Sequence, residues 1–107
     1  MKIEIPADQE RLALTAKALG HPTRVAILSF LARRKDCFFG EIHEVLNVSK
    51  PTVSNHLSEL KGAGLIQGTI KPPKVRYCIN NENWELANSM FKSFFEENSI
   101  EKKNCSC

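Results

Sequence analysis

Apolar residues recur along most of the chain at the three- and four-residue spacing that is typical of amphipathic helices. This spacing predicts a first helix over 8–19, with Asp8 as its N-cap and Gly20 as its stop. A second helix is expected to begin near Pro22, because proline is tolerated in the first turn, and to end near Arg34. The predicted buried face of the second helix consists of Ile27, Leu28 and Leu31.

Two further helices are predicted in the middle of the chain. A linker over 37–40 leads into a short third helix, whose inward residues are Ile42, Val45 and Leu46. The fourth helix is expected to begin at the N-cap Ser49 and to end at Gly62 and Gly64. Its apolar stripe consists of Val53, Leu57 and Leu60. The opposite face is polar and mostly basic, with Lys50, Thr52, Asn55, His56 and Lys61.

The pattern changes to alternation after the fourth helix. Residues 65–70 and 75–79 predict two β-strands, and the basic segment 71–74 between them predicts a hairpin tip. A last helix is expected to follow a capping region at 80–83 and to end near Asn98. Its wide apolar stripe is predicted to pack partly in the core and partly, together with the first helix, against a second copy of the chain; the stripe consists of Trp84, Ala87, Met90, Phe91, Phe94 and Phe95.

This pattern predicts one mainly helical domain with a small β-hairpin over 1–98, followed by a flexible, cysteine-containing tail over 99–107. The chain has 107 residues and a net charge of +3. Residues 49–79 hold five Lys or Arg and one Glu, a local charge of +4, whereas residues 1–48 carry +1 and residues 80–107 carry −2. The basic excess on the fourth helix and the hairpin indicates a localised surface for phosphate.

The sequence shows no apolar run long enough to cross a membrane and no secretory signal, so we expect a cytoplasmic protein. Four cysteines in such a chain are expected to be free, metal-binding or redox-active rather than paired in structural disulfides. No phosphate-binding loop, nucleophile elbow or histidine pair is present, and the three histidines lie in separate elements. These absences argue against an enzyme.

The order of elements and two motifs resemble the ArsR/SmtB family of metal-responsive repressors. The first motif is Ala18-Leu-Gly-His-Pro-Thr-Arg24, and the second is Ser49-Lys-Pro-Thr-Val-Ser-Asn-His-Leu57, followed by Ala63-Gly64-Leu65-Ile66. The resemblance covers about residues 8–98. It implies a winged helix-turn-helix fold, a homodimer joined by the first and last helices, and an inverted-repeat DNA operator from which an inducer releases the protein.

The resemblance also implies roles for individual residues. Thr52 and Asn55 are the best candidates for contacts to base edges, whereas Ser54 and His56 are expected to hold phosphates. For His56, a hydrogen bond at the edge of the core is an equally plausible reading. The full set of expected DNA-binding residues is Ser49, Lys50, Thr52, Ser54, Asn55, His56 and, in the wing, Lys71, Lys74 and Arg76.

The sensor differs from the family's better-known patterns, because the third helix contains no cysteine and the last helix contains no histidine. A thiol site is therefore expected from Cys37, Cys105 and Cys107, whose three sulfurs suit As(III) or Sb(III). Cadmium, zinc or lead is an alternative inducer, with His43 as a possible fourth ligand. A disulfide or persulfide switch between Cys37 and a tail cysteine is another alternative, and a small thiol metal carrier is a reading from a different class. Cys78 is expected to be structural.

Overall fold

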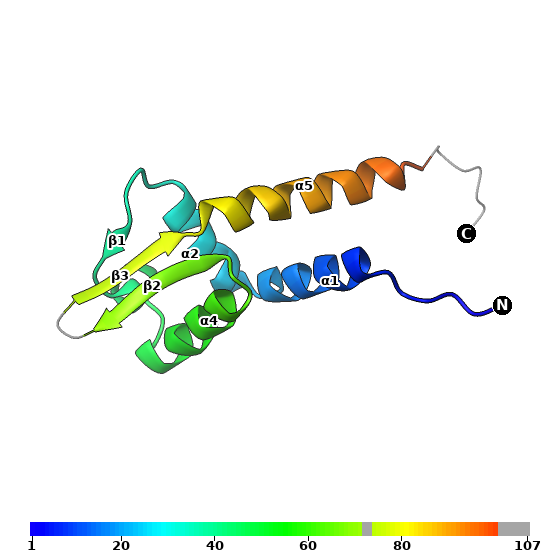
Figure 1. The fold of residues 1–107 in the computed structure, drawn as a ribbon. Helices are drawn as coiled ribbons and strands as arrows, with labels where there is room; N and C mark the ends of the chain where they lie inside the picture. Colours follow the sequence, from blue (N-terminus) through cyan, green and yellow to red (C-terminus); the bar gives the residue numbers. More distant parts are fainter. Residues whose placement is uncertain (72–73, 101–107) are drawn as a thin grey trace.

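Helices α1 (Ala7–Leu19) and α2 (Pro22–Ala32) open the fold, followed by strand β1 (Phe38–Phe39), helices α3 (Ile42–Leu46) and α4 (Lys50–Gly62), strands β2 (Ile66–Lys71) and β3 (Lys74–Ile79), and helix α5 (Asn81–Glu97). These elements come from a computed structural model that describes residues 1–71 and 74–100. The predicted order of helices and hairpin is confirmed (Figure 1).

The core lies where α2, α4 and the sheet meet. Ile27 and Leu60 have no exposed surface, and Leu28 and Ile42 are nearly as well buried. Burying one such side chain stabilises a fold by about 1.5–3 kcal/mol. The apolar stripes predicted for the second and fourth helices are both buried, so the helical spacing identified the core correctly. The buried set is Ala18, Ile27, Leu28, Leu31, Ile42, Val53, Leu57, Leu60, Leu65, Ile66, Tyr77 and Ala87.

The sheet has one strand more than the hairpin predicted from the alternation. Phe38 and Phe39, which were expected to be part of a linker, form β1 and pair antiparallel with Tyr77 and Arg76 of β3. The strand order is therefore β1-β3-β2. A two-residue strand is too short to show an alternating pattern, so its position depends on the pairing with β3 rather than on its own sequence.

Several predicted helix ends and one predicted core residue differ in the structure. Helix α1 begins after Pro6 without a side-chain cap, so Asp8 is not its N-cap. Helix α2 ends at Ala32 rather than near Arg34. Val45, which was predicted to face inward from α3, is 45% exposed. At α5, by contrast, the predicted cap region is confirmed, because the Asn80 side chain accepts a hydrogen bond from the Asn83 N–H at the helix start.

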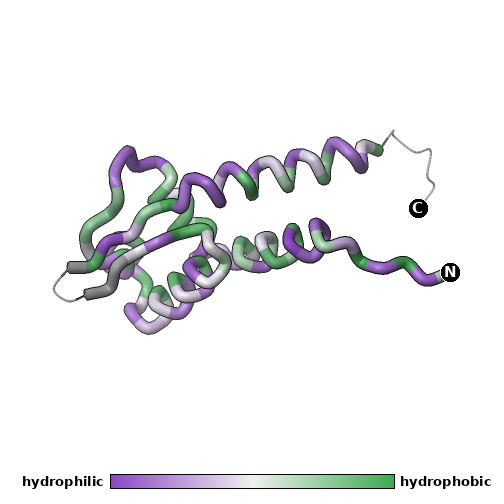
Figure 2. The backbone as a smooth tube through the Cα atoms, in the orientation of Figure 1, coloured by the Kyte–Doolittle hydropathy of each residue, from purple (hydrophilic) through white to green (hydrophobic). Residues whose placement is uncertain are grey.

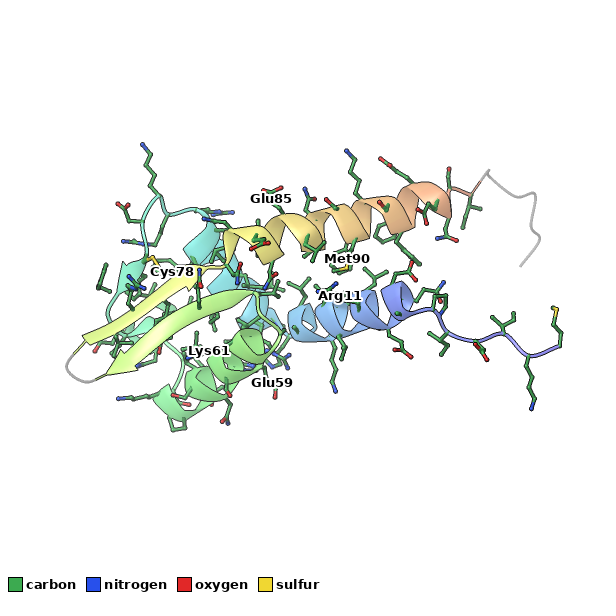
Figure 3. All side chains as sticks on the ribbon, viewed as in Figure 1. Arg11, Glu59, Lys61, Cys78, Glu85 and Met90 are labelled. Atoms are coloured by element: carbon green, nitrogen blue, oxygen red, sulfur yellow. A yellow bond between two sulfur atoms is a disulfide. The ribbon has the colours of Figure 1, made fainter. Side chains whose placement is uncertain are left out.

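Helices α1 and α5 run side by side away from the rest of the fold (Figure 1). Met90 projects from α5 toward α1 (Figure 3). The two helices leave a cavity of about 280 Å³ between them, lined by Leu12, Met90 and Phe94 among others. Apolar surface also remains uncovered, since Leu14 is 66% exposed and Phe95 is 68% exposed.

Candidate nucleic-acid interface

Helix α4 exposes mostly polar residues on the side away from the core, and two of them, Glu59 and Lys61, are labelled in Figure 3. The helix is held from behind by Val53, Leu57 and Leu60, all of which are buried. The predicted contact residues at its start and along its outer face are exposed, namely Ser49, Lys50, Thr52, Ser54 and Asn55. The structure therefore brings these five predicted residues together on one accessible surface.

The first turn of α4 is organised by side chains. Ser49 precedes the helix, as predicted, but its hydroxyl donates a hydrogen bond to Thr52 Oγ1 at 2.7 Å instead of capping a backbone N–H. This bond orients Thr52 while leaving the proton of its own hydroxyl available to a ligand. Lys50 Nζ lies 3.8 Å from Glu41 Oε1. That ion pair is exposed and therefore weak, so Lys50 can exchange Glu41 for a phosphate at little cost.

His56 is tied to the body of the protein. Arg24 Nε donates to His56 Nδ1 at 3.2 Å, and the same guanidinium donates to the Lys17 and Ala18 carbonyls at the end of α1. The rings of His56 and His21 lie 4.2 Å apart, and His21 in turn caps the start of α2. Arg24 thus joins α1, α2 and α4 around His56 and fixes how α4 sits on the fold.

The same cluster lowers the pKa of His56 from its ordinary value of 6.5, first because partial burial disfavours the charged ring and then because His21 and Arg24 add positive charge. As the pH falls through about 6.5, the unfolded chain binds more protons at His56 than the folded chain does. Acidification therefore lowers the free energy of unfolding.

We expect His56→Asn, which keeps a hydrogen-bond acceptor for Arg24, to remove the part of this acid-induced loss of stability that His56 causes. Between pH 7.5 and pH 5.5, the melting temperature should fall less in the variant than in the wild type. An equal fall in both proteins would show that the lowered pKa of His56 does not contribute to the pH dependence of stability.

The wing, defined as β2 and β3, is attached directly to α4. Lys61 Nζ donates to the Gly68 carbonyl at 3.1 Å, so the end of α4 holds the middle of β2 (Figure 3). Gly68 also allows the strands to approach, because a Cβ at this position would lie 2.6 Å from the Arg76 carbonyl oxygen. The predicted phosphate-binding residue Arg76 is exposed. Lys71 and Lys74 are backbone partners in the register of β2 and β3.

A hydrogen bond also connects the end of α4 to α5. Gly64, which follows α4, has a φ of +79°, a conformation that favours glycine. Asn83 Nδ2 on α5 donates to the Gly64 carbonyl at 2.9 Å. A Cβ at Gly64 would lie 2.8 Å from the same nitrogen, so the hydrogen bond also requires glycine. The helix with the polar face is therefore linked to the helix with the exposed apolar stripe.

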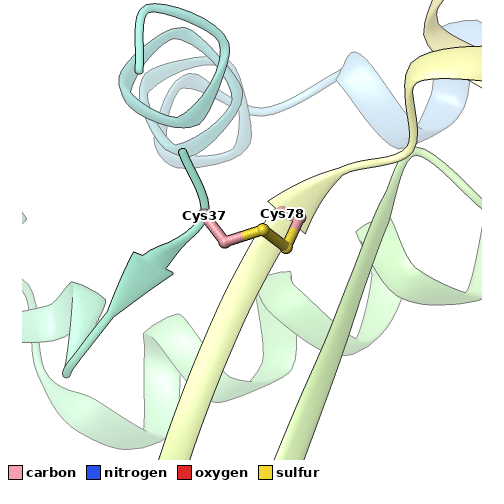
Figure 4. Close-up of a disulfide and its surroundings, with 2 residues drawn as sticks. All are labelled: Cys37 and Cys78. Carbon is pink, nitrogen blue, oxygen red and sulfur yellow. A yellow bond between two sulfur atoms is a disulfide. The ribbon is translucent and has the colours of Figure 1, made fainter. Parts of the chain in front are cut away.

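The cysteines do not follow the expectation of free thiols. Cys37 and Cys78 form a disulfide, with their Cα atoms 4.5 Å apart (Figure 4). Cys105 and Cys107 lie outside the described residues, so only Cys37 of the predicted sensor can be placed. Within the described part of the chain, no three His, Cys, Asp or Glu side chains gather in a group able to hold a metal ion.

Sequence reasoning missed three contributors to this surface. Arg24 was recognised only as part of a motif, although its donors organise the cluster around His56. Glu41 was not considered, although its carboxylate lies 3.8 Å from Lys50 Nζ and 3.4 Å from His43 Nδ1. The pairing of β1 with β3 was also missed, and it is the feature that brings Cys37 next to Cys78. The only signal for that pairing was the presence of two cysteines flanking aromatic and β-branched residues.

No helix in the described ranges is long and apolar enough to span a membrane. A family model described as "Bacterial regulatory protein, arsR family" matches residues 21–67, a range that extends from the start of α2 into β2. The regulator YgaV of Escherichia coli (strain K12) is 30% identical over 79 residues, which cover 74% of this chain and 80% of that protein. The transcriptional repressor SdpR of Bacillus subtilis (strain 168) is 38% identical over 76 residues, which cover 65% of this chain and 83% of the repressor.

A solved structure shares the fold. The winged helix-turn-helix domain of Mb0332 from Mycobacterium bovis, described as a homodimeric DNA-binding domain, superposes with a TM-score of 0.60 at 23% identity. The match covers 87% of this chain and 89% of that domain.

Proposed function

We propose, on the premise that this chain belongs to the ArsR family of bacterial regulatory proteins, that it is a repressor that binds an inverted-repeat operator as a homodimer. The observation that carries the proposal is the exposed polar face of α4 beside a basic wing, with both elements fixed to one core. A helix anchored in this way fits the major groove of DNA, where base pairs differ in their hydrogen-bonding patterns. The relatives described above are named as transcriptional regulators, not as enzymes.

The roles of individual residues follow from their positions. Thr52 and Asn55, exposed in the first two turns of α4, are proposed to contact base edges, because Asn matches the donor and acceptor of adenine. His56 Nδ1 is occupied by Arg24, so only its Nε2 is left to meet a phosphate. The remaining proposed phosphate contacts are Ser49, Lys50, Ser54, Lys71, Lys74 and Arg76.

The homodimer is proposed to form through α1 and α5. These two helices leave Leu14, Phe94 and Phe95 exposed although they contact each other. Exposed apolar residues gathered on one pair of helices are typical of a surface that a second chain covers. A two-fold symmetric pair of chains presents two copies of α4 to two half-sites, which explains why the operator is an inverted repeat.

The proposed inducer is As(III) or Sb(III), held by the thiolates of Cys37, Cys105 and Cys107. Support comes from the donor set, since three sulfurs suit a soft trigonal ion better than they suit zinc. Cys37 is bonded to Cys78 in this structure, so its sulfur is available to the ion only after the disulfide has been reduced. Cadmium, zinc or lead remains an alternative inducer in the proposal.

A second candidate is a redox-responsive repressor of the same fold, which is favoured by the observed Cys37–Cys78 bond. The tail cysteines are not needed for this switch. The two candidates differ in which substitutions abolish the response, and this difference allows one experiment to separate them.

The test of the arsenic proposal uses reduced protein and a fluorescent operator duplex. Arsenite is expected to release the DNA from the wild type and from Cys78→Ser, which keeps all three proposed ligands. Release is expected to be lost in Cys37→Ser and in Cys105→Ser/Cys107→Ser, with DNA affinity in the absence of arsenite unchanged. Fluorescence anisotropy measures both quantities. Release that persists when Cys37, Cys105 and Cys107 are all replaced by serine would place the arsenic site elsewhere.

A further inference from the structure

The Cys37–Cys78 bond joins two parts of the DNA-binding unit that the backbone holds together only weakly. Cys37 lies between α2 and β1, and Cys78 lies on β3 of the wing (Figure 4). The two residues occupy the register position next to the Phe38–Tyr77 pair. Their Cα separation of 4.5 Å matches the close type of pair between antiparallel strands. The sheet itself therefore places the two sulfurs opposite each other, so the bond can reopen and re-form in place.

The bond is accessible from a cavity of about 140 Å³ beside it. Both cysteines line this cavity and both are only half-buried. The charged residues that line it are Arg34, Lys35 and Asp36, so its side chains carry a net charge of +1. The Arg34 guanidinium lies 5.1 Å from the centre of the Phe38 ring and 5.5 Å from that of Phe30, which holds it at the cavity. A small anionic molecule is the ligand that such a cavity favours.

We propose that the Cys37–Cys78 disulfide is a redox switch, reduced by a small anionic thiol that enters beside Arg34, and that its reduction weakens operator binding. This inference rests on the proposed DNA-binding function and develops its second candidate, the redox-responsive repressor, by naming the class of reductant, its entry site and the direction of the effect on DNA binding. It differs from the arsenic site, because it uses Cys78 and neither of the tail cysteines.

The chemistry balances with two small thiols. One thiolate attacks a sulfur of the protein disulfide, forms a mixed disulfide with it, and releases the other cysteine as a thiolate. A second small thiolate attacks the small-molecule sulfur of the mixed disulfide and releases the remaining cysteine. The protein bond is thereby reduced to two thiols, while two small thiols are oxidised to one small-molecule disulfide. The reverse exchange with that small-molecule disulfide closes the bond again.

Reduction is expected to weaken DNA binding because the Cys37–Cys78 bond fixes the segment after α2 to the wing. Without the bond, the segment after α2 is held to the wing mainly by the two residue pairs of β1 and by the hydrogen bond from the Gly40 N–H to the Val75 carbonyl. The wing then loses part of its fixed position relative to α4, and binding must order it again. The cavity beside the bond also includes Asn81 and Trp84 of α5, so the same change reaches the start of the helix proposed to form the dimer.

The first test compares oxidised and reduced wild-type protein on one operator duplex by fluorescence anisotropy. Reduction is expected to weaken binding by about fivefold or more, the lower range of regulatory couplings. Cys37→Ser/Cys78→Ser is expected to bind like the reduced protein under both conditions, whereas Cys105→Ser/Cys107→Ser should keep the full difference. Equal affinities of the oxidised and reduced wild type would overturn the inference while leaving the repressor proposal intact. A complete absence of specific binding in both states would instead overturn the repressor proposal.

The second test measures the entry of the thiol without DNA. The rates at which glutathione, an anion, and cysteamine, a cation, reduce the disulfide are compared in Arg34→Gln and in Arg33→Gln, whose residue is exposed but does not line the cavity. The ratio of the glutathione rate to the cysteamine rate is expected to fall by about threefold in Arg34→Gln, as removal of one screened charge predicts. The same ratio in both variants would show that Arg34 does not select an anionic thiol.

Discussion

Replacing Thr52 and Asn55 together with alanine is expected to weaken operator binding by about 10²-fold or more, because each side chain that reads a base pair contributes about 1–3 kcal/mol. Both residues are exposed on α4, and neither belongs to the core. The fold should therefore persist, with a melting temperature close to that of the wild type. The affinity for random-sequence DNA should change little, since the basic residues that hold phosphates remain. Anisotropy titrations with operator and random duplexes measure both affinities.

The matched control is Ser58→Ala. Ser58 is also exposed on α4, but it lies one turn further along the helix, where it lines a cavity between α4 and α1 together with Arg11 and Leu14. Its replacement should leave operator affinity unchanged. No loss in the double variant would show that Thr52 and Asn55 do not read the operator, and an equal loss in Ser58→Ala would show that the effect is not specific to these two residues.

Introducing Leu14→Glu together with Phe95→Glu is expected to convert the dimer to a monomer. Both side chains are about two-thirds exposed in the single chain, at 66% and 68%, and a charge buried there in a dimer would lack a partner. Losing the dimer also costs DNA affinity, because a linked second half-site raises the affinity by about 10²- to 10⁴-fold. Sedimentation equilibrium gives the mass, and anisotropy on the operator gives the affinity.

Lys92→Glu provides the control for the added charge. Lys92 is exposed on α5, and its replacement introduces the same residue on the same helix. This variant should remain a dimer and should bind the operator with nearly the affinity of the wild type. A double variant that still sediments as a dimer would mean that the two chains associate through a surface other than the exposed faces of α1 and α5.

The apolar pattern predicted most of this architecture because burial follows helical and strand periodicity directly. The residues predicted to be buried on α2 and α4 are buried, and Tyr77 on β3 is buried between the more exposed Arg76 and Cys78. The polar face of α4 was predicted for the same reason, since it is the complement of the apolar stripe. Figure 2 shows the corresponding mixture of polar and apolar residues along α1 and α5, where the stripe is only partly covered.

The apolar pattern did not predict contacts between segments that are far apart in the sequence. The hydrogen bond from Arg24 to His56 spans 32 residues, and the Cys37–Cys78 bond spans 41. Neither contact follows from local periodicity. The Arg24–His56 hydrogen bond depends on how α2 packs against α4, and the Cys37–Cys78 bond depends on how β1 pairs with β3. The expectation that the cysteines are not paired in disulfides shows this limit, since the sequence contains Cys37 and Cys78 but does not reveal the β1–β3 register that brings them together.

Two copies of α4 and of the wing are proposed to read an inverted repeat, and the selection of binding sites from a pool of random duplex DNA by the purified oxidised protein tests this proposal. The enriched sequences are expected to share one inverted repeat, whose two half-sites are centred about one helical turn, or a multiple of it, apart. The Thr52→Ala/Asn55→Ala variant is expected not to enrich this repeat. Selection that yields no shared sequence, or the same repeat with the variant, would show that α4 does not read an inverted repeat through Thr52 and Asn55.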